Sequence, residues 1–411
     1  MAFKIHGMDC AEEVAVLKRA LSSFVDEEDL DFDVLNGRMT VRNTEDGRAI
    51  EAAVAATGMR AVPWSSGTPD EPRRGLARRG VSVAVVATDV AAAVVVVVAA
   101  DVVAIAAAAV LVAVREQLAT VWLGEGDVLD LLLVTVLAGG HVLLEDVPGV
   151  GKTTLAKGLA RALGVDFNRV QFTSDLLPAD VLGGSVYHPA DGRFEFVAGP
   201  IFTDLLLADE INRAPTRSQS AFLQAMEEGQ VTADGVSHPL SPLFTVIATQ
   251  NPIDFDSTNP LPEAQLDRFL VATRLGYPDA AAERALLGDY RTAPPLVPVL
   301  DPAGLLRLRG RAREVFLHPD LAHYIVALAR ATRQDPRVRL GISPRGAMHL
   351  AEAARARALL HGRGAVQAED VRALLHPVWG HRLLPRQGRE HDRRITAALL
   401  DDLTAGVPLP R

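Results

Sequence analysis

Residues 141–164, HVLLEDVPGVGKTTLAKGLARALG, hold the pattern that decides the fold. An apolar run of strand length leads into a loop with two glycines, and a helix-forming run follows and ends at a glycine. The P-loop pattern requires Gly, four residues and then Gly-Lys-Ser/Thr in this strand–loop–helix setting. Gly151, Lys152 and Thr153 satisfy it, but Asp146 occupies the position of the first glycine. Because that position precedes the tightest part of the loop, we still predict a phosphate-binding loop.

Further apolar runs of strand length follow along the chain. With the first they occupy residues 141–145, 168–173, 204–209, 243–250 and 269–275. Helical stretches separate most of them, which favours a parallel sheet covered by helices. After Pro278 no further strand run is present, and about four helical stretches remain. We therefore predict an α/β domain over 115–280 and a helical lid domain over 290–390.

The loop supplies the groups that bind phosphate. Glycines at 149 and 151 let backbone N–H groups converge on the anion, and the helix N-terminus adds its positive dipole end. The Lys152 amine is expected to reach the β- and γ-phosphates, and the Thr153 hydroxyl to bind Mg²⁺. The predicted nucleotide-binding residues are Pro148, Gly149, Val150, Gly151, Lys152, Thr153 and Thr154.

Two later strands end in polar residues. Asp209 and Glu210 close the run LLLADE, where Asp209 would bind the metal shell through water and Glu210 would act as general base. The simpler alternative is an exposed acidic pair that caps the next helix. Asn251 ends the run FTVIATQN and is placed to orient water, or else is a turn residue before a proline. Together with the loop, these residues predict a nucleotide hydrolase.

Several stretches carry a family resemblance. They are LLEDVPGVGKTTLAK, QFTSDLLPADVLGG, FEFVAGPIFTDLLLADEINRAP, SAFLQAMEEGQVT, VIATQNP, LPEAQLDRFL and LGISPRGAMHLAEAARARALL. Over about residues 112–385 the chain resembles the MoxR branch of the AAA+ ATPases, in which Asp before Val-Pro-Gly is usual. The resemblance implies ATP and Mg²⁺, a homo-oligomeric ring of hexamer type, and chaperone-like remodelling of protein partners, among them von Willebrand-A-domain proteins.

The resemblance also assigns roles by position. Lys152, Thr153 and Thr154 match Walker A, Asp209 and Glu210 match Walker B, Asn251 matches sensor 1, Arg268 matches the arginine finger and Arg345 matches sensor 2. Arg213 is a rival to Arg268 for contact between subunits. Arg345 stands near a predicted helix N-terminus, where a cation is unfavourable, so we expect an anion from the other domain to face it. The alternative for Arg345 is ordinary solvation at the surface.

Residues 1–66 form a separate predicted domain. Strand-like and helix-like runs alternate in the order βαββαβ, a ferredoxin-like unit, with a hairpin signal at Asn36-Gly37. The stretch HGMDCAEEV resembles the metal loop of heavy-metal-associated domains of the kind found in zinc-type P-type ATPases. Glu13 replaces that loop's second cysteine, so Cys10 with nearby carboxylates would suit Zn²⁺. The alternative is that the domain binds no metal.

A basic Pro/Gly linker over 67–80 precedes a Val/Ala-rich apolar segment over 81–114. Asp89 and Asp101 interrupt this segment, which leaves uncharged runs of 11 and 13 residues. A membrane span needs about 20 apolar residues. We therefore favour a helical connector and a cytoplasmic protein, with membrane association through 81–114 as the alternative.

Charge and cysteine content exclude other classes. The net charge of −9 argues against a general nucleic-acid-binding role. The single cysteine allows no internal disulfide. Two alternative functions stay open: a metal-responsive regulatory protein that uses the N-terminal domain, and a motor subunit of the chelatase type.

Overall fold

The computed structural model contains two compact units, Met1–Val81 and Ser82–Arg411. In the first unit the structure describes residues 2–6, 21, 25, 30–33, 38–41, 50, 54 and 60–63. In the second it describes residues 90–410 except 123, 125, 148, 190–191, 252–258, 260, 288–295 and 387–392.

The first unit contains a four-stranded antiparallel sheet in the order β2-β3-β1-β4. Its strands are β1 (Ala2–His6), β2 (Leu30–Asp33), β3 (Arg38–Val41) and β4 (Arg60–Pro63). The four predicted strands are confirmed, and β2 and β3 pair with Asp33 opposite Arg38. Cys10 and the Asn36-Gly37 turn lie outside the described residues.

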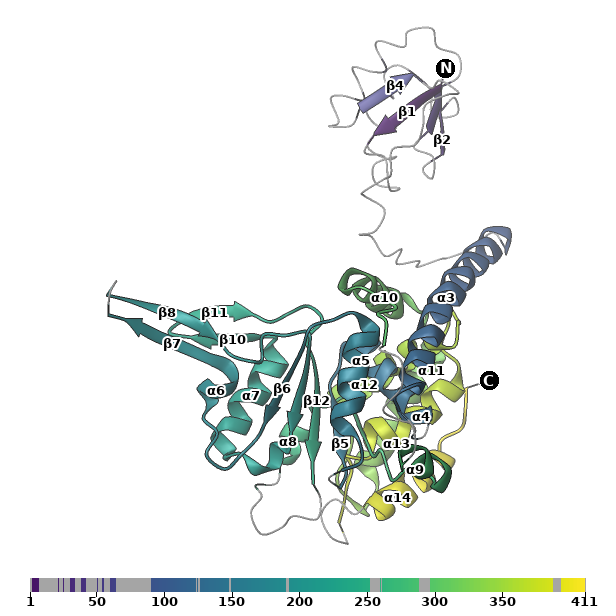
Figure 1. Ribbon diagram of the computed structural model, residues 1–411. Coiled ribbons are helices and arrows are strands. Elements are labelled where there is room, and N and C mark those ends of the chain that lie inside the picture. The colour runs from purple at the N-terminus through teal and green to yellow at the C-terminus, as the bar shows by residue number, and fades with distance from the viewer. Residues whose placement is uncertain are drawn as a thin grey trace. The chain divides into compact units, whose positions relative to one another are not determined.

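The second unit is built on a five-stranded parallel sheet in the order β13-β5-β12-β9-β6 (Figure 1). Its strands are β5 (Val142–Glu145), β6 (Phe167–Gln171), β9 (Leu205–Asp209), β12 (Thr245–Gln250) and β13 (Val271–Thr273). Each of them overlaps one of the five predicted runs. The predicted parallel sheet is confirmed.

Helices cover both faces of this sheet, because alternate strand residues point to opposite sides. In β9, Leu205 and Leu207 join the core formed with α4 (Gly126–Ala138), α5 (Lys152–Leu163) and the lid helices. Leu206 and Ala208 join the core formed with α6 (Pro178–Leu182) and α7 (Thr216–Glu228). The short α8 (Glu263–Leu266) precedes β13.

The lid follows β13 and is mostly helical. Its helices are α9 (Ala280–Leu287), α10 (Pro302–Glu314), α11 (Pro319–Gln334), α12 (Pro344–Leu360), α13 (Ala368–Trp379) and α14 (Arg393–Ala405). The expectation that no strand follows Pro278 is wrong in one detail. Short strands β14 (Val338–Leu340) and β15 (Leu384–Pro385) pair antiparallel between lid helices.

The apolar segment before the α/β domain is helical from residue 90. Helix α3 (Val90–Ala119) runs through the predicted boundary at 114/115. Its second half buries residues 104, 107, 111, 114 and 118, an apolar stripe at helical spacing that packs on the core shared by α4, α5 and the lid. None of the helices in the part that the structure describes combines the length and apolarity that a membrane crossing needs.

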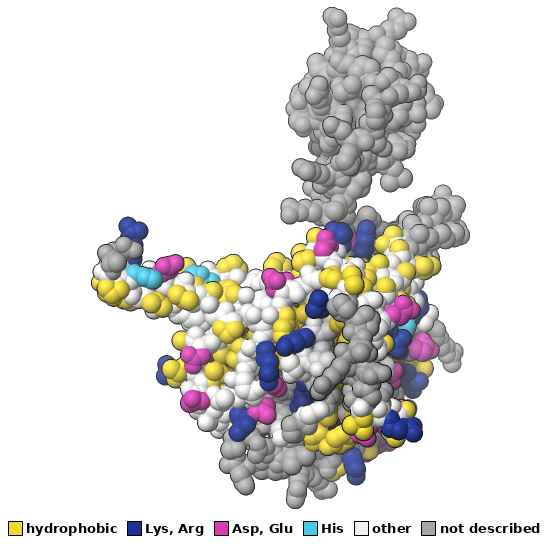
Figure 2. All heavy atoms as spheres, in the orientation of Figure 1, with side chains coloured by type: hydrophobic (Ala, Val, Ile, Leu, Met, Phe, Trp, Pro, Cys, Tyr) yellow, Lys and Arg dark blue, Asp and Glu magenta, His cyan; other side chains and the backbone are white. Residues whose placement is uncertain are grey.

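Two hairpins project from the domain (Figure 1). They are β7 (Gly183–His188) with β8 (Arg193–Ala198), and β10 (Gln230–Ala233) with β11 (Val236–Pro239). Phe196 and His238 stack between them, with ring centroids 3.9 Å apart. Figure 2 shows apolar side chains along the projecting arm, where Tyr187 and Phe194 are exposed. The run that forms β7 and β8 was not among the predicted strands.

Candidate functional site

The candidate site lies where three adjacent parallel strands end. In the sheet β12 has β5 on one side and β9 on the other, and Gln250 pairs in register with Glu145. The phosphate-binding loop follows β5, Asp209 ends β9, and Asn251 follows β12. Ligands of parallel α/β sheets bind beyond these carboxyl ends. The predicted residues of the three motifs are thus brought to the same edge.

The loop has the backbone that its glycines predict. Gly149 and Gly151 both have φ of +88°, a left-handed conformation that residues with a Cβ rarely adopt. Val150 between them is buried, and Pro148 lies outside the described residues. Gly151 is also the N-cap of α5, so the first-turn amides of this helix, which lack carbonyl partners within it, face the loop. Such a terminus favours an anion.

Asp146 has a definite structural task. Its carboxylate accepts hydrogen bonds from the backbone N–H groups of Leu275 and, at 3.1 Å, Gly276, which follow β13 and lead toward the lid. The residue is buried, and its own N–H donates to Gln250 O at 3.1 Å. Aspartate here therefore ties the start of the loop to the segment before the lid, a contact that glycine could not make.

Lys152 lies close enough to the acidic residues predicted at the same site to interact with them electrostatically. Its Nζ donates to the backbone carbonyl of Asp146 at 2.8 Å, which draws the amine back over the loop. Burial lowers the pKa of Lys152, while the carboxylates of Asp146, Asp209 and Glu210 oppose this and favour the charged amine. The lysine and the acidic pair, far apart in sequence, thus interact at the same site.

Asp209 is held by both neighbouring strands. Its Oδ1 accepts from the Thr249 hydroxyl on β12 at 2.7 Å, and its Oδ2 pairs with Arg169 on β6 at 2.7 Å. Thr249 is fully buried, so its rotamer and that of the carboxylate are fixed together. The structure therefore presents Asp209 at the strand end in a defined orientation.

Glu210 has an unusual backbone. Its φ of +56° places a non-glycine residue in the left-handed region, and the Thr249 hydroxyl accepts its N–H at 2.9 Å. Its Oε2 accepts from Gln171 at 2.9 Å and pairs with Arg213 at 3.0 Å. Strain of this kind costs about 1–3 kcal/mol and clusters at functional sites. In this backbone conformation the Glu210 carboxylate contacts both Gln171 and Arg213.

The oxygen donors at this edge fit Mg²⁺, which prefers hard oxygen ligands and keeps several waters. Thr153 stands half-buried in the first turn of α5 and Asp209 ends β9, whereas Thr154 is exposed. A hydroxyl and a carboxylate leave room for water and phosphate oxygens in the shell. When bound, the ion would neutralise charge that develops on the phosphate oxygens.

Asn251 directly follows β12, and its backbone carbonyl accepts from Asn212 Nδ2 at 3.3 Å. This bond connects the end of β12 to the short helix Ile211–Arg213 just after Glu210. The end of β12 therefore lies next to the segment that follows Glu210, and the water-orienting role of Asn251 stays a prediction.

The two arginines predicted by resemblance lie together at one carboxylate. Arg268 Nε forms an ion pair with Glu227 Oε2 at 2.8 Å, and Arg345 pairs with the other oxygen of the same carboxylate. Glu227 is on α7 of the α/β domain, and Arg345 is at the second position of lid helix α12. The anion expected to face Arg345 from the other domain is thus Glu227.

The predicted metal loop is not described. Cys10 and its neighbours lie outside the described residues, so Zn²⁺ binding there stays a prediction. Among the residues that are described, no group of three or more His, Cys, Asp or Glu side chains could hold a metal ion.

Sequence reasoning missed the residues that hold the predicted ones: Thr249, Gln171, Arg169 and Glu227. One signal was available for the first two. Thr249 is next to the end of the predicted run 243–250, and Gln171 lies two residues before the end of the predicted run 168–173; the carboxyl ends of parallel strands meet at one edge. Glu227 carried no such signal, because it sits within an ordinary amphipathic helix.

Comparisons with known proteins agree with this geometry. The family model described as "ATPase family associated with various cellular activities (AAA)" matches residues 141–271, and the model of the AAA lid domain matches residues 330–402. Chaperone MoxR1 of Mycobacterium tuberculosis is 40% identical over 298 residues, which cover 70% of this chain and 79% of that protein. Protein MoxR of Paracoccus denitrificans is 35% identical over 319 residues, with 71% and 93% covered.

Two further relatives extend the comparison. The uncharacterized protein YeaC of Bacillus subtilis is 43% identical over 298 residues, which cover 72% of this chain and 93% of that protein. A solved structure described as a "putative ATPase" from Cytophaga hutchinsonii superposes with a TM-score of 0.68 at 31% identity. The match covers 75% of this chain and 97% of that chain.

Proposed function

This chain belongs to the MoxR family of AAA+ ATPases and is an ATP hydrolase, and from that premise we propose that it works as a ring-forming homo-oligomer that remodels protein partners. The name of one relative, Chaperone MoxR1, supports the chaperone-like part of this proposal. Partners of the von Willebrand-A type are those that the family resemblance implies.

Within one subunit we assign the roles by position and contact. Lys152 would neutralise charge on the β- and γ-phosphates, Thr153 would bind Mg²⁺, and Asp209 would contact the metal shell through water. The Glu210 carboxylate would separate from Gln171 and Arg213 and then accept a proton from the attacking water, which Asn251 would orient. The observation that carries these roles is that the loop after β5, the end of β9 and the end of β12 meet at one edge of the sheet. The direction of the Lys152 pKa shift, to which the carboxylates of Asp209 and Glu210 contribute, agrees with this placement.

Between subunits we assign Arg268 to the γ-phosphate of a neighbouring subunit's nucleotide. Its ion-pair partner is Glu227 of its own chain, not a phosphate-loop residue, which supports a role outside its own site. Arg345 shares that carboxylate and is therefore assigned to the same contact. Arg213, the rival arginine, pairs with Glu210 within its own subunit.

The test is the ATPase rate per subunit as a function of protein concentration, alongside light scattering that reports the oligomer. We expect the rate to rise and saturate as the oligomer forms. Arg268→Ala should lower kcat by at least about 1,000-fold with ATP affinity retained. Arg274→Ala, at an exposed arginine six positions along, is the matched control. A rate per subunit that is constant through oligomer dissociation contradicts the proposal.

A further inference from the structure

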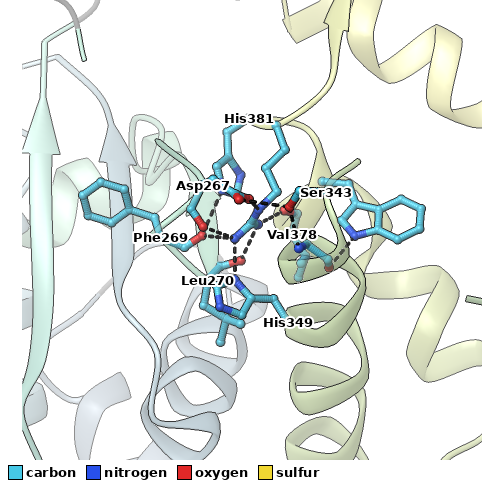
Figure 3. A network of polar contacts seen from close by, with 10 residues as sticks. Asp267, Phe269, Leu270, Ser343, His349, Val378 and His381 are labelled. Carbon is cyan, nitrogen blue, oxygen red and sulfur yellow. Dashed lines mark hydrogen bonds and ion pairs between the residues drawn. The ribbon is translucent and has the colours of Figure 1, made fainter. Parts of the chain in front are cut away.

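Arg382 is a buried arginine at the junction of the lid and the α/β domain, just beyond α13. Its exposed fraction is 5%, and its Nε forms an ion pair with Asp267 Oδ1 at 2.7 Å. Its terminal nitrogens donate to the backbone carbonyls of Asp267 at 3.0 Å, Phe269 at 2.5 Å and Leu270 at 3.2 Å, and to that of Val378. Figure 3 shows these acceptors converging on one point.

Lid residues complete the same network. The Ser343 hydroxyl donates to the second carboxylate oxygen of Asp267 at 2.9 Å, and also accepts from the Gly346 N–H as N-cap of α12. His349 Nδ1 lies 2.5 Å from an Arg382 terminal nitrogen, and His381 Nε2 lies 3.0 Å from the carbonyl oxygen of Phe269. Every oxygen of the Asp267 side chain and every backbone carbonyl named here is thus engaged by the lid (Figure 3).

Stability alone does not account for this arrangement. A buried ion pair is weak evidence for stability, because desolvation offsets its attraction, and apolar replacements of similar volume are often neutral or stabilising. What a planar guanidinium adds is geometry, since its fixed fork of donors sets the positions of several acceptors at once. The acceptors here are the backbone of residues 267–270, so their positions are what the arginine specifies.

Residues 267–270 include Arg268, the arginine that we assign to the nucleotide of the neighbouring subunit. Arg268 lies directly between Asp267, which Arg382 binds twice, and Phe269, whose carbonyl Arg382 also binds. Arg345 stands two residues after Ser343, the other partner of the Asp267 carboxylate. A Cβ at Gly346 would lie 3.1 Å from Arg382 Cδ, so the start of α12 is fitted closely around the arginine stem.

We propose that Arg382 is a positioning residue for Arg268: by holding residues 267–270 against the lid it fixes the place at which Arg268 meets the neighbouring nucleotide. This inference rests on the proposed function, because it requires Arg268 to act between subunits. Arg345 lies at the same junction, because Ser343, two residues before it, binds the Asp267 carboxylate.

A second buried arginine offers a matched control. Arg309 on α10 also joins the lid to the α/β domain, through Val136 O at 2.7 Å, Leu243 O at 3.1 Å and Thr245 Oγ1 at 2.7 Å. Its exposed fraction is 6%, close to that of Arg382. Val136 lies on α4, and the other two acceptors lie just before and at the start of β12, the end of the strand opposite to Asn251. A general effect of weakening the lid contact should therefore appear equally in Arg309→Lys.

The experiment compares full-length Arg382→Lys, Asp267→Asn and Arg309→Lys. Lysine keeps the charge but not the planar fork, so Arg382→Lys should misplace residues 267–270. Because a misplacement of about 1 Å can cost 100-fold in rate, we expect kcat to fall by about 10- to 100-fold. The dissociation constant for ATP should stay within about twofold, because that site is built from other residues. Arg309→Lys should lose stability but keep kcat within about threefold.

Mixed oligomers then separate positioning from general damage. Glu210→Gln subunits have lost their own base but keep Arg268 and Arg382 intact. In a ring of head-to-tail interfaces, an Arg382→Lys subunit beside such a partner receives a correctly placed arginine. In an equimolar mixture the rate per Arg382→Lys subunit should therefore recover toward about half of the wild-type rate. Asp267→Asn removes the negative charge that Arg382 binds, and its rate should recover in the same way in a mixture with Glu210→Gln.

The mixture of Arg268→Ala with Glu210→Gln separates two claims: that Arg268 acts between subunits, and that Arg382 positions Arg268. If this mixture does not recover, Arg268 does not act between subunits and the proposed function itself is wrong. If it recovers while the Arg382→Lys and Asp267→Asn mixtures do not, or if both variants keep wild-type kcat, the positioning role of Arg382 is wrong. Should Arg382→Lys fail to fold, the Asp267→Asn mixture decides the matter in the same way.

Discussion

Restoring the strict P-loop pattern by Asp146→Gly should destabilise the protein. The Asp146 carboxylate accepts two backbone N–H groups, those of Leu275 and Gly276, and both the carboxylate and the Leu275 contact are buried. Hydrogen bonds to a charged group contribute about 1.5–3 kcal/mol each. Glycine leaves both donors without their acceptor, although it also removes the cost of burying a charge.

We expect the free energy of unfolding to fall by about 2–4 kcal/mol after that offset. The Lys152 ammonium would keep its bond to the backbone carbonyl of residue 146, so the affinity for ATP should change little. Asp146→Asn is the matched control, since its amide oxygen still accepts a hydrogen bond. Its loss should be about 1 kcal/mol.

Urea unfolding of the full chain, followed through its midpoint and slope, measures the overall effect. Hydrogen exchange measures it locally, because the amides of Leu275 and Gly276 should exchange roughly 30- to 900-fold faster if the local loss is 2–4 kcal/mol. Unchanged unfolding and unchanged exchange at these two amides, or tighter ATP binding in Asp146→Gly, would refute the view that this aspartate ties the loop to the lid segment.

Three further changes have defined outcomes. Thr249→Val removes the hydroxyl that holds Asp209 and the N–H of Glu210, so kcat should fall about tenfold or more and stability by about 1–3 kcal/mol, and an unchanged kcat would contradict this. Burial, followed by the charge of Arg382, lowers the pKa of His349 to about 3. The unfolded chain takes up this proton below its ordinary pKa of about 6.5, whereas the folded chain does so only near pH 3. The free energy of unfolding should therefore fall as the pH falls from about 6.5 to about 3, by up to about 1.4 kcal/mol per pH unit, and His349→Gln should flatten this slope. Equal slopes in the two proteins would contradict that assignment. Gly346→Ala should destabilise by about 1–3 kcal/mol although alanine is the better helix former, because its Cβ would lie 2.9 Å from Ile342 Cγ2; an equal or higher melting temperature would show that the site has room.

The sheet could be predicted because its signal is local. Each strand of a buried parallel sheet is a short apolar run, and all five such runs became strands β5, β6, β9, β12 and β13. The β7–β8 hairpin was missed because its exposed faces mix polar, aromatic and glycine residues without a regular alternation. The β10–β11 turn had a usable signal in Asp234-Gly235, whose φ values of +49° and +79° are those that an Asp-Gly turn provides.

Domain boundaries were harder to predict than strands. The Val/Ala-rich composition of 81–114 indicated a connector, yet α3 continues beyond it to Ala119 and buries residues on both sides of the expected boundary. Composition changes at residue 115, where charges begin, but the apolar stripe that packs on the domain does not. Periodicity within the segment, not composition, held the information about packing.

The site was predictable as far as chain position determines it. Motif spacing placed Lys152, Asp209, Glu210 and Asn251 at one edge of the sheet, because parallel strands all end there. It did not indicate that Thr249 would bind both acidic residues, or that Arg268 and Arg345 would share Glu227. Those contacts depend on side-chain directions between elements far apart in sequence, and single-sequence patterns do not contain them.

We propose that Lys152, Asp209 and Glu210 surround the terminal phosphate of one bound ATP. The most direct test measures ATP binding and ATP turnover in parallel for Glu210→Gln, an almost isosteric change. We expect the dissociation constant to stay within about threefold of the wild type while kcat falls at least about 1,000-fold, because only the base is lost. Wild-type turnover in Glu210→Gln, or loss of binding together with turnover, would contradict it.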